Sequence, residues 1–473
     1  MKRIIIEKKE LVNEKAKELF KEFKEFVGIH SLEGVRVLNS YEIFNATDEQ
    51  VKKIIDSVLC EPILDMVYED FPPIADDEKA FRVENLRGQY NQREDAVNNM
   101  VSSYLGFEEV YIRHSEIIIL KNASDEDLEK AKSYYINPTE SREVPLDYAF
   151  QEKEAFAEDL VEVVEGFISM DNNELIEIID KLGLAMDIED LLLCQKYFRQ
   201  ELRNPTVAEL KIIDTYWSDH CRHRTFATEI VQVDVEEGRY NEVFEKAILE
   251  YLASREFVYE DNSKPVCLMD LATINMKEIK KKGLLEDKEE TDEVNAASIE
   301  VDVDVDGKTE KWLLMFKNET HNHPTEIEPF GGAHTCLGGG IRDPLSGRAY
   351  VYQAMRLTGS ADPRQKYHDT LKGKLPQRKI TQTAMEGYST YGYQIGSTSG
   401  YIQEFYDEGF VAKRMELGAL VAAAPKDWVV RGKPEKGDLV LLIGGRTGRD
   451  GIGAAVGSSK EQTDKALETS GAE

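Results

Sequence analysis

The strongest constraint on the fold is an alternation of two kinds of segment in residues 3–137. Runs rich in β-branched residues, RIIIEKK and GVRVLNSYEIF, are separated by amphipathic runs, VNEKAKELFKEFKEF and DEQVKKIIDSVLC. The same order returns in KAFRVENL, QREDAVNNMVSSYL, EEVYIRHSEIIIL and DEDLEKAKSYYI. Apolar residues in these two kinds of run follow strand and helix periodicity, respectively. The sequence therefore predicts two β-α-β-α units, a duplicated α/β sandwich domain over residues 1–140.

Three changes of pattern follow this domain. The turn-forming segment NPTESREVPLD predicts a linker, and helical periodicity then predicts a helical connector over residues 141–203. Thr206 and Glu209 form a capping-box pattern at the start of the next helix. Further runs predict the strands of an α/β domain over residues 204–410: IVQVDV, VCLMDL, SIEVDVDV and KWLLMFK.

The last segment, GDLVLLIGGRTGRDGIGAAVGSSKEQTDKAL, predicts a strand, a glycine loop and a helix. These would begin a further α/β subdomain over residues 411–473. A single strand with a single helix cannot cover both faces of a sheet. We therefore expect this subdomain to be truncated and the chain to be a fragment.

The formal net charge of −31 disfavours nucleic acid as a partner, because an acidic surface repels phosphate backbones. A few cationic side chains can still bind one small anion. No run reaches the ~20 apolar residues that span a membrane. The five cysteines contain no CxxC pair, which argues against a zinc ribbon or a disulfide framework. These features predict a cytoplasmic protein with neither membrane nor nucleic acid as a partner.

Polar side chains are concentrated in KNETHNHP, directly after the apolar run WLLMF. Strand ends are common positions for sites in α/β folds. Glu319 offers an oxygen ligand for Mg²⁺, and Lys317 can pair with a nucleotide phosphate. His321 can act as a general base, while Asn322 and His323 can hydrogen-bond a substrate. The alternative is a polar turn closed by the following proline.

A glycine-rich segment, PFGGAHTCLGGGIRDP, comes next. Its glycines predict a loop whose backbone amides could approach an anion closely. Arg342 could bind phosphate with two hydrogen bonds, and Asp343 could hold a second magnesium ion. A plain turn is the alternative.

The third cluster is SDHCRHR, at the end of the helix that begins near Thr206. Helix carbonyls favour cationic side chains at this end, which would explain the cluster without a site. His220, Cys221 and His223 are residue types that bind zinc, but adjacent ligands are poorly spaced for tetrahedral coordination. The chain has neither a P-loop nor a GxGxxG pattern, so ATP binding would require another fold.

Three motifs, WSDHCRHRTF, FKNETHNHPTEIEPFGGAHTCLGGGIRD and GGRTGRDGIG, occur in the order found in phosphoribosylformylglycinamidine synthases. RGQYNQREDA and NPTESRE extend the likeness, so the chain resembles the N-terminal portion of the large, single-chain form of this family. The resemblance implies an N-terminal domain similar to the small separate subunit, a helical linker and a domain like aminoimidazole ribonucleotide synthetase.

The reaction implied is that of a ligase in purine biosynthesis. ATP phosphorylates the formamide oxygen of formylglycinamide ribonucleotide, and ammonia displaces the phosphate to give the amidine. The ammonia comes from a glutaminase domain, the glutamine amidotransferase part of the enzyme, which this chain lacks. ATP and Mg²⁺ are the implied cofactors.

The resemblance also assigns roles to individual residues. His220 and His321 would be catalytic, with His321 as the proton acceptor. Lys317 and His223 would contact ATP, and Glu319 and Asp343 would bind magnesium. The implied substrate contacts are Thr320, Asn322, His323 and Arg342.

Two other functions compete with the ligase. A metal-dependent phosphoesterase or nuclease could use Glu319, His321, His323 and Asp343 as ligands or base. A non-catalytic interaction fragment would use residues 1–203 only for docking. ATP-dependent phosphate release that requires the substrate distinguishes the ligase from metal-dependent cleavage of a diester.

Overall fold

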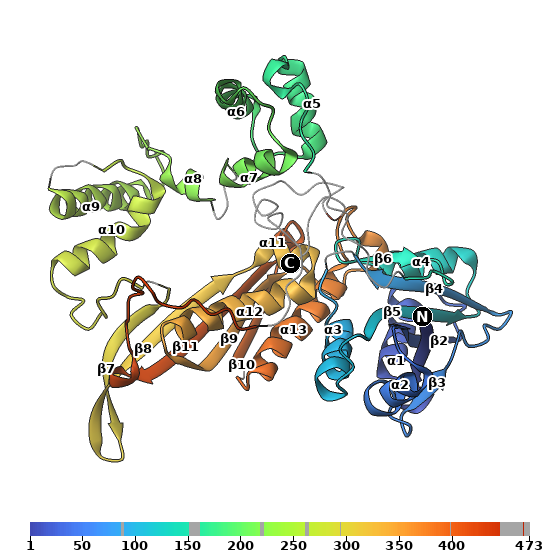
Figure 1. Ribbon diagram of the computed structural model, residues 1–473. Coiled ribbons are helices and arrows are strands. Elements are labelled where there is room, and N and C mark those ends of the chain that lie inside the picture. The colour runs from blue at the N-terminus through green and yellow to red at the C-terminus, as the bar shows by residue number, and fades with distance from the viewer. Residues whose placement is uncertain are drawn as a thin grey trace.

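The computed structural model describes residues 1–86, 89–150, 161–217, 222–260, 264–293, 295–397, 399–444 and 467. It has a mixed α/β architecture built on two sheets, which confirms the predicted class (Figure 1). No described helix is long and apolar enough to cross a membrane.

The first sheet has six strands in the order β3-β1-β2-β5-β4-β6, with antiparallel neighbours throughout. Its strands are β1 Lys2–Lys8, β2 Gly34–Phe44, β3 Asp65–Tyr68, β4 Glu78–Asn85, β5 Tyr111–Lys121 and β6 Ser141–Val144. The helices between them are α1 Glu14–Lys21, α2 Asp48–Ile54, α3 Gln92–Asn99 and α4 Asp125–Tyr135. The two predicted β-α-β-α units are present, and β3, which pairs with β1, is an additional strand between them.

Alternation along each strand explains why this sheet forms. Ile4 and Ile6 point to one face, where they join a buried cluster with Val51 of α2. Ile5 points to the other face and packs with Leu38 of β2. Strand β6 pairs with β4, so the predicted linker after residue 140 begins instead with an edge strand of this sheet. Its four residues were too few to show a period of two.

Within the predicted connector, residues 141–203, lie α5 Asn172–Leu182 and α6 Ile188–Glu201, and α7 Val207–Trp217 follows it. The predicted capping box is present: the backbone N–H of Glu209 donates to Thr206 Oγ1 at 3.0 Å, and Glu209 Oε2 accepts from the Thr206 N–H at 2.8 Å. Leu175, Leu191, Phe198 and Leu210 form a common core. These helices therefore share one hydrophobic cluster.

Two predicted strands were wrong. The run IVQVDV lies outside any strand, and Val231 is 91% exposed. The run VCLMDL instead begins α10 (Leu268–Lys281), where the Cys267 side chain accepts from the backbone N–H of Asp270. A short apolar run fits a strand or a buried helical turn equally well, and here the capping contact favours the helix. Helices α8 His223–Ala227 and α9 Asn241–Tyr259 complete this region.

The second sheet has the order β10-β9-β11-β8-β7. Its strands are β7 Ala297–Val305, β8 Lys308–Thr320, β9 Tyr350–Ser360, β10 Ser399–Tyr406 and β11 Met415–Pro425. The predicted strands SIEVDVDV and KWLLMFK are confirmed as β7 and β8. Strands β9 and β10 are parallel, and β8 and β9 are both antiparallel to the intervening β11. The carboxyl ends of β8, β9 and β10 therefore meet at one edge of the sheet.

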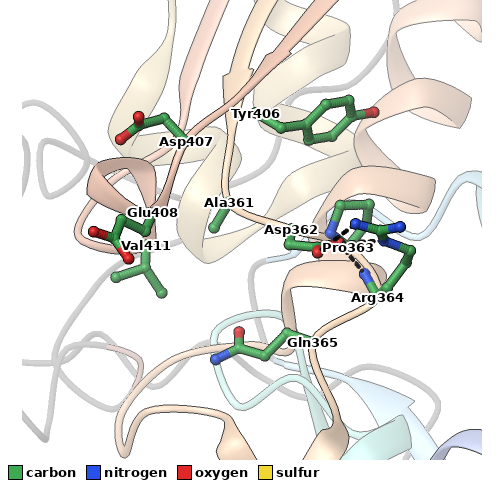
Figure 2. Close-up of a pocket in the computed structure, with 9 residues that line it drawn as sticks. All are labelled: Ala361, Asp362, Pro363, Arg364, Gln365, Tyr406, Asp407, Glu408 and Val411. Carbon is green, nitrogen blue, oxygen red and sulfur yellow. Dashed lines mark hydrogen bonds and ion pairs between the residues drawn. The ribbon is translucent and has the colours of Figure 1, made fainter.

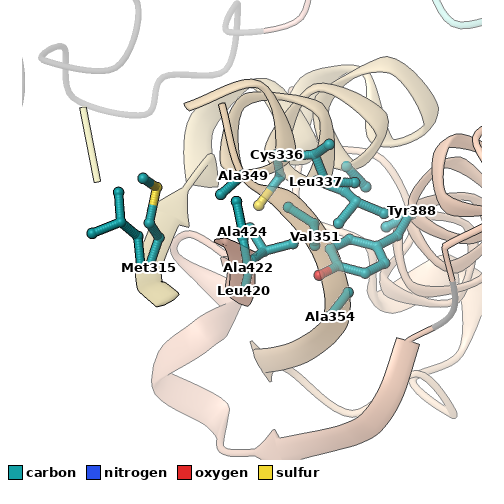
Figure 3. Close-up of a cluster of buried hydrophobic side chains, with 14 residues drawn as sticks. Met315, Cys336, Leu337, Ala349, Val351, Ala354, Tyr388, Leu420, Ala422 and Ala424 are labelled. Atoms are coloured by element: carbon teal, nitrogen blue, oxygen red, sulfur yellow. The ribbon is translucent and has the colours of Figure 1, made fainter. Parts of the chain in front are cut away.

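Helices α12 (Pro329–Ser346) and α13 (Gln377–Gln394) lie side by side over one face of this sheet (Figure 1). Figure 3 shows the core between them, where Leu337 of α12 and Tyr388 of α13 meet Val351 and Leu420 from the strands. A short helix, α11 (Asn322–Ile327), joins β8 to α12. The motif KNETHNHP, predicted to form a site, spans the end of β8 and the start of α11.

The predicted strand near residue 440 is absent from the described part of its segment. Residues 437–444 have no strand geometry, and Leu439, Val440 and Leu442 are at least 87% exposed. A strand requires a neighbour for its backbone hydrogen bonds, and within the described chain this segment has none. The predicted glycine loop and helix lie outside the described residues, apart from Gly444 and a helical position at Leu467.

Candidate functional site

The centre of the candidate site is a lysine between two carboxylates. Lys317 Nζ lies 2.7 Å from Asp343 Oδ2 and 3.4 Å from Glu319 Oε2. Lys317 and Glu319 share the face of β8 that buries Leu313 and Met315, but they lie beyond the core, toward the carboxyl end of the strand. All three charged side chains keep a quarter to a third of their surface exposed. Asp343 raises the pKa of Lys317, with a smaller contribution from Glu319.

The glycine-rich segment predicted to be a loop is the helix α12, and that prediction was wrong. Glycine disfavours helices by about 1 kcal/mol relative to alanine, so the composition predicted a loop. The glycines instead allow close packing. A Cβ at Gly332 would lie 2.3 Å from the backbone nitrogen of Thr325, and one at Gly340 would lie 2.1 Å from Leu420 Cδ1. The close approach brings α12 back along β8, with Asp343 beside Lys317.

Substitution of Gly332 tests this packing. We expect Gly332→Ala to lower the free energy of unfolding by about 1–3 kcal/mol, because its methyl group would overlap backbone. Gly339→Ala is the matched control, since its Cβ would meet nothing closer than 3.6 Å and alanine favours the helix. Urea unfolding followed by circular dichroism measures both. Equal stability of the two variants would contradict the packing argument.

The HNH part of the motif lies at the start of α11 and is held by β11. The backbone N–H of His321 donates to the carbonyl of Glu416 at 3.0 Å. Asn322 Oδ1 accepts from the backbone N–H of Glu416 at 2.9 Å. The Thr325 hydroxyl donates to the His321 carbonyl at 2.6 Å. The backbone around the His321 ring is therefore fixed, while the side chain itself stays partly exposed.

His323 is buried, with 4% of its surface exposed, whereas the His321 side chain is partly exposed. Burial is the main cause that lowers its pKa to about 4, and the charges of Lys413 and Lys374 contribute. The ring is therefore neutral near pH 7 and packed within the protein. Its predicted contact with substrate, like that of Asn322, stays a prediction.

The other predicted residues are placed differently. Thr320 is exposed and follows Glu319 on β8, so its side chain points to the opposite face of the sheet. Arg342 is exposed on α12, and its Nη1 lies 3.4 Å from Tyr391 Oη. His223 is exposed on α8, which packs against α10. His220 and Cys221 lie outside the described residues.

Two residues at the site were missed by sequence reasoning. Glu416 is fully buried; its carboxylate accepts from Arg356 Nε at 2.6 Å and Arg414 Nε at 2.9 Å, and its backbone holds His321 and Asn322. Tyr391 on α13 contacts Arg342 and the ring of His334. Neither residue lies in a polar motif, and both approach the site only through tertiary packing.

The carboxylates of Glu319 and Asp343 fit a magnesium ion that also binds phosphate. Mg²⁺ is commonly held by one or two carboxylates together with phosphate oxygens and water. Among the described residues, no group of three or more His, Cys, Asp or Glu side chains could hold a metal ion. Two carboxylates beside a lysine suit a metal that arrives with a nucleotide.

A cavity of about 840 Å³ lies at the same edge of the sheet but not at these residues (Figure 2). It is formed by Ala361–Gln365 after β9 and by the segment from Tyr406 to Val411 after β10. Arg364 makes an ion pair with Asp362 across 2.9 Å, so its charge is already compensated. Strand β11 separates the cavity from the Lys317 cluster, which consists of Lys317, Glu319 and Asp343. None of the predicted site residues lines the cavity.

Comparisons with known proteins find similarity to phosphoribosylformylglycinamidine synthases. The model of the formylglycinamide ribonucleotide amidotransferase linker domain matches residues 175–224. The phosphoribosylformylglycinamidine synthase subunit PurL of Thermoplasma volcanium is 26% identical over 284 residues, covering 60% of this chain and 30% of that protein. The corresponding subunit of Methanobrevibacter smithii is 35% identical over 159 residues, covering 33% of this chain and 20% of that protein.

A solved structure, T. maritima PurL complexed with ADP, covers 51% of this chain and 28% of its own, with 18% identity and a TM-score of 0.27. A TM-score this low does not bear on the fold of this chain. This chain spans 30% and 20% of the lengths of the two relatives above.

Proposed function

We propose that this chain is part of a cytoplasmic, magnesium-dependent phosphoribosylformylglycinamidine synthase of the large, single-chain form. It would contribute to the ATP-dependent conversion of formylglycinamide ribonucleotide to formylglycinamidine ribonucleotide. The observation that carries the proposal is the position of Lys317 between Glu319 and Asp343, where β8 ends. The linker match and the PurL relatives support the synthase part of this proposal. The relatives are named as a subunit, so the single-chain form rests on the order of the sequence motifs alone.

The proposed reaction activates an amide. An amide oxygen is a poor leaving group until it is phosphorylated, and bound magnesium would neutralise charge on the transferred phosphoryl group. Lys317 would contact the ATP phosphates, and Glu319 and Asp343 would hold the metal. When nucleotide binds, the Lys317 ammonium can exchange its carboxylate partners for phosphate oxygens.

Histidine provides the proton transfer in the second step. Ammonia would attack the carbon that bears the phosphorylated oxygen. As the C–N bond forms, the nitrogen loses a proton, and the C–O bond breaks to release phosphate. His321 would accept this proton, with its backbone fixed by Glu416. His220 would assist as a second catalytic residue and His223 would lie beside the nucleotide. Thr320, Asn322, His323 and Arg342 would contact the substrate.

The domain assignments form part of the same proposal. Residues 1–140 would correspond to the small separate subunit, 141–203 to the linker and 204–410 to the ATP- and substrate-binding subdomain. Residues 411–473 would begin the second subdomain. A glutaminase domain outside this chain would supply ammonia.

The test is phosphate release in the complete enzyme. We expect release from ATP to require both formylglycinamide ribonucleotide and ammonia, and to stop when magnesium is removed. Phosphate release that is independent of the ribonucleotide, or metal-dependent cleavage of a phosphodiester, would contradict the proposal.

A further inference from the structure

A carbonyl at the end of α11 is bound by the N-terminal sheet unit. Asn137 Nδ2 donates to the carbonyl of Ile327, the last residue of α11, at 2.8 Å. Thr139 Oγ1 lies 3.1 Å from the same oxygen. Both side chains are buried, with at most 3% of their surface exposed. These contacts join residues 190 and 188 positions apart in the chain.

The contact satisfies a need of the helix. The last carbonyls of a helix have no partner within it, and a buried one must find a donor elsewhere. Ile327 is 1% exposed, so water has little access to it. The loop that provides the donor is itself braced: Thr139 Oγ1 lies 2.6 Å from Asn137 Oδ1, and Asn137 Nδ2 also donates to Glu140 Oε1 at 3.1 Å.

A second contact seats this loop on α13. Lys379 Nζ donates to the carbonyls of Tyr134 and Tyr135, at 2.6 and 3.0 Å, which are the last two residues of α4. A cation at the C-terminal end of a helix is favoured by the helix dipole. Burial lowers the pKa of Lys379 to about 8, which still leaves the ammonium mostly charged at pH 7. The residues that follow α4 are thereby brought against α11.

The segment 321–327 is thus fixed at both ends by different parts of the protein. At its start, Glu416 of β11 binds the backbone of His321 and the side chain of Asn322. At its end, Asn137 binds the carbonyl of Ile327. We propose that Asn137, assisted by Thr139, is a positioning residue for the candidate site. The N-terminal sheet unit then sets the position of the histidine segment through the carbonyl of Ile327.

Hydrogen exchange tests this role without any assumption about the reaction. In Asn137→Ala, we expect the backbone amides of residues 322–328 to exchange roughly five- to tenfold faster, because one buried hydrogen bond is lost. Thr139→Val should show a smaller increase in the exchange rate of these amides. Thr139→Ser, which keeps the hydroxyl, should retain the protection of the unchanged protein. Exchange is measured by mass spectrometry on the whole 473-residue chain.

The control breaks the same interface elsewhere. Arg378 Nη2 makes an ion pair with Glu22 Oε1 at 2.7 Å, also between α13 and the N-terminal unit. Arg378→Met should leave exchange in residues 322–328 unchanged. If Asn137→Ala does not fold, Thr139→Val decides by the same measurement. Unchanged protection of residues 322–328 in the folded variants, or an equal loss in Arg378→Met, would overturn the inference.

A kinetic readout separates this inference from the proposed function on which its catalytic meaning rests. In the complete enzyme, Asn137→Ala should lower kcat with little change in the KM for ATP, since Asn137 is buried and acts through the backbone of Ile327. Faster exchange together with an enzyme that lacks the proposed reaction would retain the positioning role and reject the function. Normal exchange in a variant that keeps full activity would reject the positioning role and retain the proposed function.

Discussion

Replacement of His321 by alanine is expected to lower kcat of the complete enzyme by about 10²–10⁴-fold, the usual contribution of general acid–base catalysis. The KM values for ATP and formylglycinamide ribonucleotide should change little. The hydrogen bonds made by the backbone N–H and carbonyl of His321 do not depend on its side chain, so they are kept in the variant. Steady-state rates of phosphate release measure both constants.

Two comparisons sharpen the His321 experiment. His368→Ala is the control, since this imidazole is 73% exposed and lies in a short 3₁₀ helix before α13. High ammonia in place of glutamine then locates the defect, because ammonia bypasses a glutaminase but not the synthetase step. Full rescue by ammonia would reject the proton-acceptor role. A raised KM with normal kcat would make His321 a binding residue.

Local pattern was sufficient for the first sheet because each of its main strands and helices carries its own periodicity. Strand β1 was recognised by a different signal: Ile4, Ile5 and Ile6 form a short apolar, β-branched run, because both faces of the strand are buried. The same reasoning failed for VCLMDL, because a short apolar run does not distinguish a strand from the first turn of a helix. It also failed for α12, where the cost of glycine in a helix is outweighed by close packing against Thr325 and Leu420.

The candidate site was predictable in part for a related reason. Lys317 and Glu319 are two residues apart on a strand, so their common face follows from the sequence. Asp343 could be predicted as a ligand but not placed, because its position depends on how closely α12 approaches β8. Glu416 and Asn137 could not be predicted, since each acts on the histidine segment from a distant part of the chain.

Replacement of Glu319 by glutamine should reduce ATP turnover by about 10²-fold or more, because a neutral amide is a weaker magnesium ligand and bound metal contributes several kcal/mol to phosphoryl transfer. The shape of the side chain is kept, so the fold should be unchanged. Of these two carboxylate partners, Lys317 would then keep only Asp343. Turnover should recover partly at high magnesium if the ion still binds weakly.

The matched control for Glu319 is Glu310→Gln on the same strand, where the carboxylate is exposed and accepts from Trp312 Nε1 at 3.1 Å, far along β8 from the cluster. Asp343→Asn should reduce ATP turnover as Glu319→Gln does, because both carboxylates contact the Lys317 ammonium. A magnesium titration of ATP turnover is the measurement. If Glu319→Gln keeps normal turnover when magnesium is limiting, Glu319 is not a metal ligand, and its contact with Lys317 only orients the lysine.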